Sequence, residues 1–204
     1  MNDRPALDRM PRSQAVGGRG ASLVETLLAS VLLVIVAIPI FGMLEGSSRI
    51  FARGDAASGL HHHLRASMDQ MVRELRMAGY DPSATAVPAA FEVAGATTVR
   101  FIADTDADGT TDRIEYAYDA AARTITRQFW RWGGADWGPG SGPLVVARSV
   151  DSLTFTYFDA TDAPPAGLVD IRRVTVAVAA SQAVAGYGPE RYTVSSEARA
   201  RNLF

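Results

Sequence analysis

Residues 20–44 of the chain, GASLVETLLASVLLVIVAIPIFGML, decide the fold class. Glu25 is the one charged residue in this stretch, and the 19 residues from Thr26 to Leu44 are uncharged and mostly apolar. As a helix rising about 1.5 Å per residue, those residues extend roughly 29 Å, which matches the hydrocarbon thickness of a bilayer. The pattern therefore predicts a transmembrane helix over 21–44.

Two other interpretations of this apolar stretch are weaker. A buried helix of a soluble protein rarely runs so far without a polar face. A cleaved secretory signal peptide has a shorter apolar core of about 7–15 residues, which ends at small residues. Here the helical pattern continues beyond Leu44. The membrane helix is the favoured interpretation.

The residues before the apolar stretch predict its orientation. Four arginines precede it: Arg4, Arg9, Arg12 and Arg19. Basic residues next to a membrane helix are retained in the cytoplasm. We therefore expect a single-pass inner-membrane protein whose N-terminus is cytoplasmic and whose remaining chain is periplasmic.

A charged Glu25 is energetically unfavourable inside this apolar segment. A carboxylate inside an apolar segment costs a few kcal/mol in the bilayer unless it is solvated or paired. Either Glu25 lies in the wet interfacial region, or a positive charge from another molecule pairs with it.

Residues 20–28, GASLVETLL, resemble the prepilin cleavage and methylation motif of type IV pilins and type II secretion pseudopilins. In that family a prepilin peptidase cuts after the glycine, the new N-terminal residue is N-methylated, and the glutamate is the fifth mature residue. The resemblance implies that residues 1–20 are a leader ending at Gly20 and that Ala21 is the mature N-terminus. It also implies that Glu25 pairs with the terminal ammonium of a neighbouring subunit during assembly.

Residues 45–78 continue the helix in amphipathic form. Leucines and methionines recur at spacings of three and four, which places them on one helical face: Leu60, Leu64, Met68, Met71 and Leu75. We expect a helix over 21–78 with a weak point near Gly54 or Gly59. Its amphipathic half should pack on a globular head, and Gly79-Tyr80-Asp81-Pro82 should end it.

The head, residues 79–204, shows short alternating runs that predict about seven mostly antiparallel strands. The runs are 99–103, 114–118, 124–131, 144–148, 153–158, 171–179 and 191–198. The fold class is therefore α+β, with a long N-terminal helix packed on a mostly antiparallel β-rich head.

Three further segments are similar to one branch of the pilin family. Residues 71–80, which hold a Leu-Arg-x-Ala-Gly-Tyr run, resemble the end of the long helix in PilW-type minor pilins. Residues 150–159 and 171–176 resemble late head strands of PilW-type minor pilins and of J-type minor pseudopilins. The helix-end run favours the minor pilin.

An acidic loop in the head matches the calcium-loop pattern D-x-D-x-D-G-x5-E. Its predicted ligands are Asp104, Asp106, Asp108, the Thr110 carbonyl, Asp112 through a water, and Glu115. The alternative is a solvated hairpin turn, because Asp and Gly favour turns and the flanking residues are predicted strands.

Other chemistry finds little support in the sequence. The chain has no cysteine, all 20 of its basic residues are arginine, and its net charge of −2 gives no basic excess for nucleic acid. His61, His62 and His63 point in different directions on a helix and cannot converge on one ion. Trp130, Trp132 and Trp137 form either a carbohydrate- or partner-binding surface or the packing beneath a loop. We expect no enzyme activity.

Together these features predict a minor pilin that is assembled into the tip or priming complex of a type IV pilus. Its expected partners are the prepilin peptidase, other minor and major pilin subunits, and inner-membrane lipid before assembly. Two alternatives are a J-type minor pseudopilin of a type II secretion system and a membrane-anchored calcium- or carbohydrate-binding module. Calcium is the one expected cofactor.

Overall fold

A computed structural model of the chain describes residues 22–85, 89–183 and 188–202. The predicted leader, Gly20 and Ala21 lie outside the described residues. The chain divides into two compact units, Met1–Ser47 and Ser48–Phe204. The boundary falls within the long helix, so the C-terminal half of that helix belongs to the same unit as the strands.

Helix α1, Leu23–Arg76, has 54 residues and contains Pro39. It continues without interruption through Gly54 and Gly59, where we expected a weak point. Its N-terminal part, Leu23–Ser48, is long and apolar enough to cross a membrane. Its mean hydropathy is 2.8, and its most apolar stretch is not buried by the rest of the described chain. The predicted membrane-type helix is therefore present.

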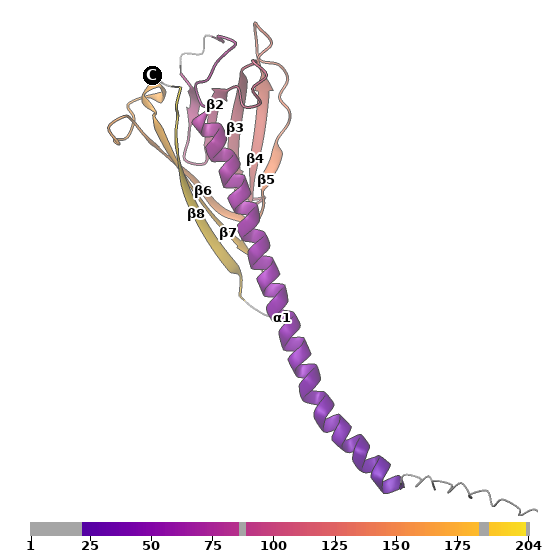
Figure 1. Cartoon of the computed structure of the whole chain (residues 1–204). Coiled ribbons are helices and arrows are strands. Elements are labelled where there is room, and N and C mark those ends of the chain that lie inside the picture. Colours follow the sequence, from indigo (N-terminus) through magenta and orange to yellow (C-terminus); the bar gives the residue numbers. More distant parts are fainter. Residues whose placement is uncertain (1–21, 86–88, 184–187, 203–204) are drawn as a thin grey trace, which may run out of the picture. The chain divides into compact units, whose positions relative to one another are not determined.

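The C-terminal half of α1 buries the predicted stripe. All five stripe residues, from Leu60 to Leu75, are at most 5% exposed and belong to the core of the second unit. The stripe packs against both sheets, which lie on either side of these helical turns (Figure 1). The structure thus confirms the α+β fold class.

All eight strands in the described ranges pair antiparallel, in two sheets. The first sheet has the order β1-β2-β3-β4-β5, with β1 Phe91–Ala94, β2 Thr98–Ala103, β3 Asp112–Asp119, β4 Thr124–Arg131 and β5 Leu144–Ala147. The second has the order β6-β7-β8, with β6 Val150–Phe158, β7 Arg173–Gln182 and β8 Glu190–Arg199. The seven predicted runs correspond to β2–β8, and β1 is the strand that the sequence pattern did not predict.

The helix ends at Arg76, two residues before the predicted end. Gly79 then adopts a φ of +86°, a left-handed conformation that suits glycine, and its N–H donates to the Ile102 carbonyl at 2.9 Å. One residue further, the Tyr80 carbonyl accepts the Asp104 N–H at 3.1 Å. These two bonds fasten the end of the helix to the end of β2, where the acidic loop begins.

Candidate functional site

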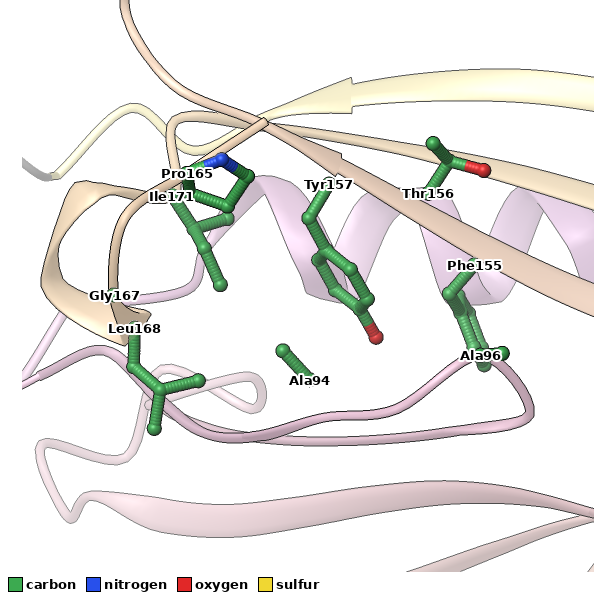
Figure 2. Close-up of a pocket in the computed structure, with 9 residues that line it drawn as sticks. All are labelled: Ala94, Ala96, Phe155, Thr156, Tyr157, Pro165, Gly167, Leu168 and Ile171. Atoms are coloured by element: carbon green, nitrogen blue, oxygen red, sulfur yellow. The ribbon is translucent and has the colours of Figure 1, made fainter. Parts of the chain in front are cut away.

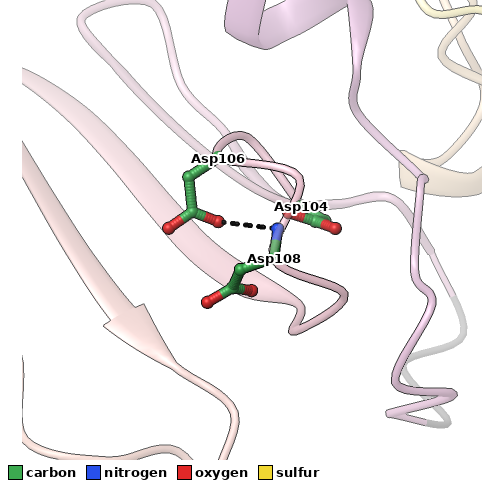
Figure 3. Close-up of side chains that lie close together, drawn as sticks. All are labelled: Asp104, Asp106 and Asp108. Carbon is green, nitrogen blue, oxygen red and sulfur yellow. Dashed lines mark hydrogen bonds between the residues drawn. The ribbon is translucent and has the colours of Figure 1, made fainter.

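The acidic loop connects β2 to β3, and the structure brings three of its carboxylates together. One oxygen each from Asp104, Asp106 and Asp108 lie within 4.8 Å of one another, a grouping that could hold a metal ion. Figure 3 shows these side chains around one tight turn of the chain. Among the described residues, this is the one group of three or more potential ligands that lie so close together, and His61–His63 are not part of such a group.

Backbone hydrogen bonds shape the turn. Asp104 Oδ2 accepts the Gly109 N–H at 3.0 Å, and Asp106 Oδ1 accepts the Asp108 N–H at 3.4 Å. Asp108 Oδ1 accepts the Thr110 N–H at 2.8 Å, and this bond is the main reason that the pKa of Asp108 lies below its ordinary value. Each aspartate therefore turns one carboxylate oxygen toward the backbone of its own loop.

The segment after α1 supports the loop from one side. Thr111 N–H donates to Ser83 Oγ at 2.9 Å, and the Ser83 N–H donates to Thr111 Oγ1 at 3.2 Å. Thr111 Oγ1 in turn donates to Asp81, whose other oxygen accepts the Thr85 N–H and hydroxyl. The sequence analysis did not identify these buttressing residues, because nothing in the local pattern of 81–85 shows that they fold against 109–111.

Arg131 supplies a positive charge on the exposed side of the loop. Its guanidinium donates to Asp106 Oδ2 at 2.8 Å, lies 3.1 Å from Asp108 Oδ2 and lies 3.5 Å from Asp112 Oδ1. The carboxylates of Asp108 and Asp112 are the main causes of a raised Arg131 pKa. The sequence analysis missed Arg131, although the β3–β4 hairpin pairs it with Asp112.

Asp112 begins β3 and is only 4% exposed. Burial raises the pKa of its carboxyl above the ordinary value, and the nearby Arg131 charge opposes that shift. Thr110 lies in the turn, where its N–H donates to Asp108, and Asp112 is linked to the loop through Arg131 but is not one of the three grouped aspartates.

Glu115, the predicted closing ligand, is placed elsewhere. It lies opposite Arg100 in the β2–β3 register, and its carboxylate accepts the Arg100 Nε–H at 2.8 Å. Successive side chains of a strand point to opposite faces. Asp112 shares the buried face with Ile114 and Tyr116, whereas Glu115 is on the other face. In an EF-hand a helix would bring position 12 back to the ion, but a strand does not.

Glu25 lies in the first turn of α1 and is exposed. A negative charge there is favourable because the N-terminal end of a helix dipole is positive. The neighbouring side chains Leu23, Val24, Leu27 and Leu28 are also 60–81% exposed. Glu25 is thus a carboxylate set on an uncovered apolar surface.

The tryptophans are half-buried and make specific ring contacts. Trp132 and Trp137 meet edge to face at 5.2 Å, and the Arg113 guanidinium lies 4.2 Å from the Trp137 ring centre. The Arg100 guanidinium lies 5.4 Å from the Trp130 ring centre. These contacts favour the packing interpretation over a free aromatic binding surface.

A groove of about 450 Å³ lies beside the start of η1, the 3-10 turn Leu168–Asp170 (Figure 2). Its lining is mainly apolar and includes Phe155, Tyr157 and Ile171. Tyr157 is its one titratable side chain, and that hydroxyl donates to the Gly95 carbonyl at 2.9 Å. The groove offers no carboxylate or imidazole for acid–base chemistry.

No protein-family model matches the chain, and none of the curated proteins is significantly similar to it.

Proposed function

We propose that the protein is a minor pilin, processed by a prepilin peptidase between Gly20 and Ala21 and assembled into the tip or priming complex of a type IV pilus. The observation that carries this proposal is the uncovered apolar helix Leu23–Ser48, whose first turn holds Glu25. An apolar surface of this length needs lipid or other apolar helices around it.

The position of Glu25 supports assembly over simple anchoring. If cleavage follows Gly20, the new ammonium at Ala21 is four residues before Glu25. A neighbouring subunit shifted along the helix axis could bring its ammonium to this carboxylate. Such a pair would offset the cost of burying Glu25 and would set the register between subunits.

The J-type minor pseudopilin would use the same helix and the same pairing. The Leu75-Arg76-Met77-Ala78-Gly79-Tyr80 run favours the pilus, by its resemblance to the helix end of PilW-type minor pilins. In the structure this run begins with the last two residues of α1 and includes Gly79, whose turn fastens the helix to β2.

The experiment is intact-mass analysis of the chain from native membranes together with co-purification of pilin subunits. We expect loss of residues 1–20, one added methyl group on Ala21, and recovery of the protein with other pilins. Gly20→Val should block cleavage. Glu25→Val should permit cleavage but abolish recovery with the other pilins, because it removes only the pairing charge.

Glu45→Gln is the matched control, since it neutralises the carboxylate at the other end of the apolar stretch and should leave cleavage and recovery intact. Retention of residues 1–20 with an unmethylated Ala21 would overturn the proposal and favour a permanent membrane anchor. Normal recovery of Glu25→Val would refute the pairing argument.

A further inference from the structure

We propose that the β2–β3 loop is a calcium site in which Asp104, Asp106 and Asp108 are carboxylate ligands, Asp112 replaces Glu115 as the fourth acidic group, and Arg131 competes with the ion. The inference concerns the head alone and is independent of assembly through α1.

The first observation is the buried oxygen of Asp104. This residue is 1% exposed, and its Oδ2 accepts the Gly109 N–H. Its Oδ1 is buried and has no hydrogen-bond partner among the described residues. Burying a carboxylate oxygen without a donor is unfavourable, because the oxygen loses its water and gains nothing in return. A cation within the loop would supply the missing partner.

The second observation is the spacing of the ligand oxygens. The three aspartates bring oxygens within 4.8 Å of one another. Oxygens bound to one Ca²⁺ at 2.3–2.6 Å can lie up to about 5 Å apart, whereas Mg²⁺ at 2.0–2.1 Å restricts them to about 4.2 Å. The group therefore fits within one calcium coordination sphere.

The third observation identifies the fourth acidic group. Asp106, Asp108 and Asp112 all face the same Arg131 guanidinium, at 2.8, 3.1 and 3.5 Å. Asp112 lies outside the group of three but faces the same guanidinium, so it would act through a water, whereas the carboxylate of Glu115 is bound to Arg100. In calcium loops the position of Asp112 acts directly or through a water, and the Thr110 position supplies its backbone carbonyl.

The positive charge of Arg131 opposes calcium binding at this loop. Its side chain is 49% exposed, so it can move into solvent when an ion enters. The guanidinium neutralises part of the loop's negative charge, and like charges repel, so its presence weakens calcium binding. Removing this charge should therefore tighten calcium binding, although the same change breaks every ion pair that Arg131 makes.

The test is calorimetric titration of Ca²⁺ into the detergent-solubilised full chain after metal removal by a chelator and dialysis. We expect one saturable site with a Kd of about 0.1–1 mM, the range of extracellular calcium modules, and weaker Mg²⁺ binding. Asp106→Asn and Asp108→Asn should each weaken binding about tenfold or more, since ligand charge sets the affinity. Both side chains are exposed enough that the variants should fold.

Arg131→Gln should tighten calcium binding about three- to tenfold at low salt, because one opposing charge near the ion is removed. Asp159→Asn is the matched control. Asp159 also accepts the backbone N–H of the residue two positions later, Thr161, but it lies in another turn, so the calcium affinity of this variant should equal that of the native chain. No saturable Ca²⁺ binding by the native chain, or unchanged binding in Asp106→Asn, would overturn the site and leave only a solvated turn. Weaker binding in Arg131→Gln would overturn the competition.

Discussion

Replacing Glu74 with glutamine should lower the free energy of unfolding of the second unit by about 3 kcal/mol, although the change is nearly isosteric. Glu74 lies on the buried side of α1 and accepts the Arg127 Nε–H at 2.9 Å and the Tyr116 hydroxyl at 2.9 Å. Gln70 donates to its other oxygen at 3.1 Å. The carboxylate therefore joins the helix to β3 and β4.

The magnitude follows from burial. The side chains of Glu74 and Arg127 are 12% and 14% exposed, and Tyr116 is fully buried. Removing one partner of a buried ion pair costs about 3–5 kcal/mol, because the other charge stays buried without compensation. Because Arg127 keeps a small exposure to solvent, we expect the loss in unfolding free energy to lie at the lower end of this range, at about 3 kcal/mol. Tyr116→Phe should cost less, about 1.5 kcal/mol, because it removes one hydrogen bond to a charged group and leaves the ion pair intact.

The assay is urea unfolding of the full chain in detergent, followed by tryptophan fluorescence, since all three tryptophans lie on β4 or just after it. Glu197→Gln is the control. That carboxylate also pairs with two arginines, Arg173 and Arg199, but its side chain is 46% exposed, so the loss should stay below about 1 kcal/mol.

The double variant Glu74→Met with Arg127→Met should be more stable than Glu74→Met alone, since it leaves no unpaired charge. A Glu74→Gln loss no larger than that of Glu197→Gln would refute the reasoning. So would a double variant whose loss equals the sum of the two single losses.

Two further predictions concern the core. Met71 is fully buried between the helix and the sheets, so Met71→Ala should cost about 2–5 kcal/mol in the same urea assay, whereas Met43→Ala, at a side chain that is 78% exposed, should leave the unfolding of the second unit unchanged. Burial raises the pKa of Tyr116 and Tyr157 above the ordinary value near 10, so the stabilisation from their neutral forms is complete below about pH 10 and is lost as the pH rises through their folded-state values. In an alkaline titration followed at 295 nm, fewer than the six tyrosines of the chain should ionise before unfolding, and ionisation of all six near pH 10 with native tryptophan fluorescence would contradict this.

The sequence predicted the elements whose hydrophobic period is long and regular. The five-residue stripe of α1 spans more than four turns, and every member is buried. Alternation likewise located β4, whose predicted bounds, Thr124–Arg131, agree with the structure. β1 has only four residues, Phe91–Ala94, too few to establish a period of two. Its pairing with β2 depends on tertiary contact, which the local sequence does not carry.

The acidic loop shows the same limit at the level of single residues. The linear pattern located Asp104, Asp106 and Asp108 and was right about their proximity. It could not give Arg131, because that contact depends on the register of the β3–β4 hairpin. Once the two strand runs were assigned, counting back from the turn at 120–123 would have placed Arg131 opposite Asp112.

Whether Glu115 can reach an ion in the loop depends on the secondary structure that follows the loop as well as on the residue spacing of the calcium-loop pattern. On β3, Arg113 and Glu115 lie on the face opposite the core, where Arg113 pairs with Glu92 and Glu115 pairs with Arg100. This arrangement needs no ion, since each carboxylate already has a guanidinium within hydrogen-bond distance. Asp112, three positions earlier and on the other face, has Arg131 only at 3.5 Å. The alternation of β3 therefore places Glu115 beside Arg100 on one face and Asp112 on the buried face, on the side of Arg131 and the acidic loop.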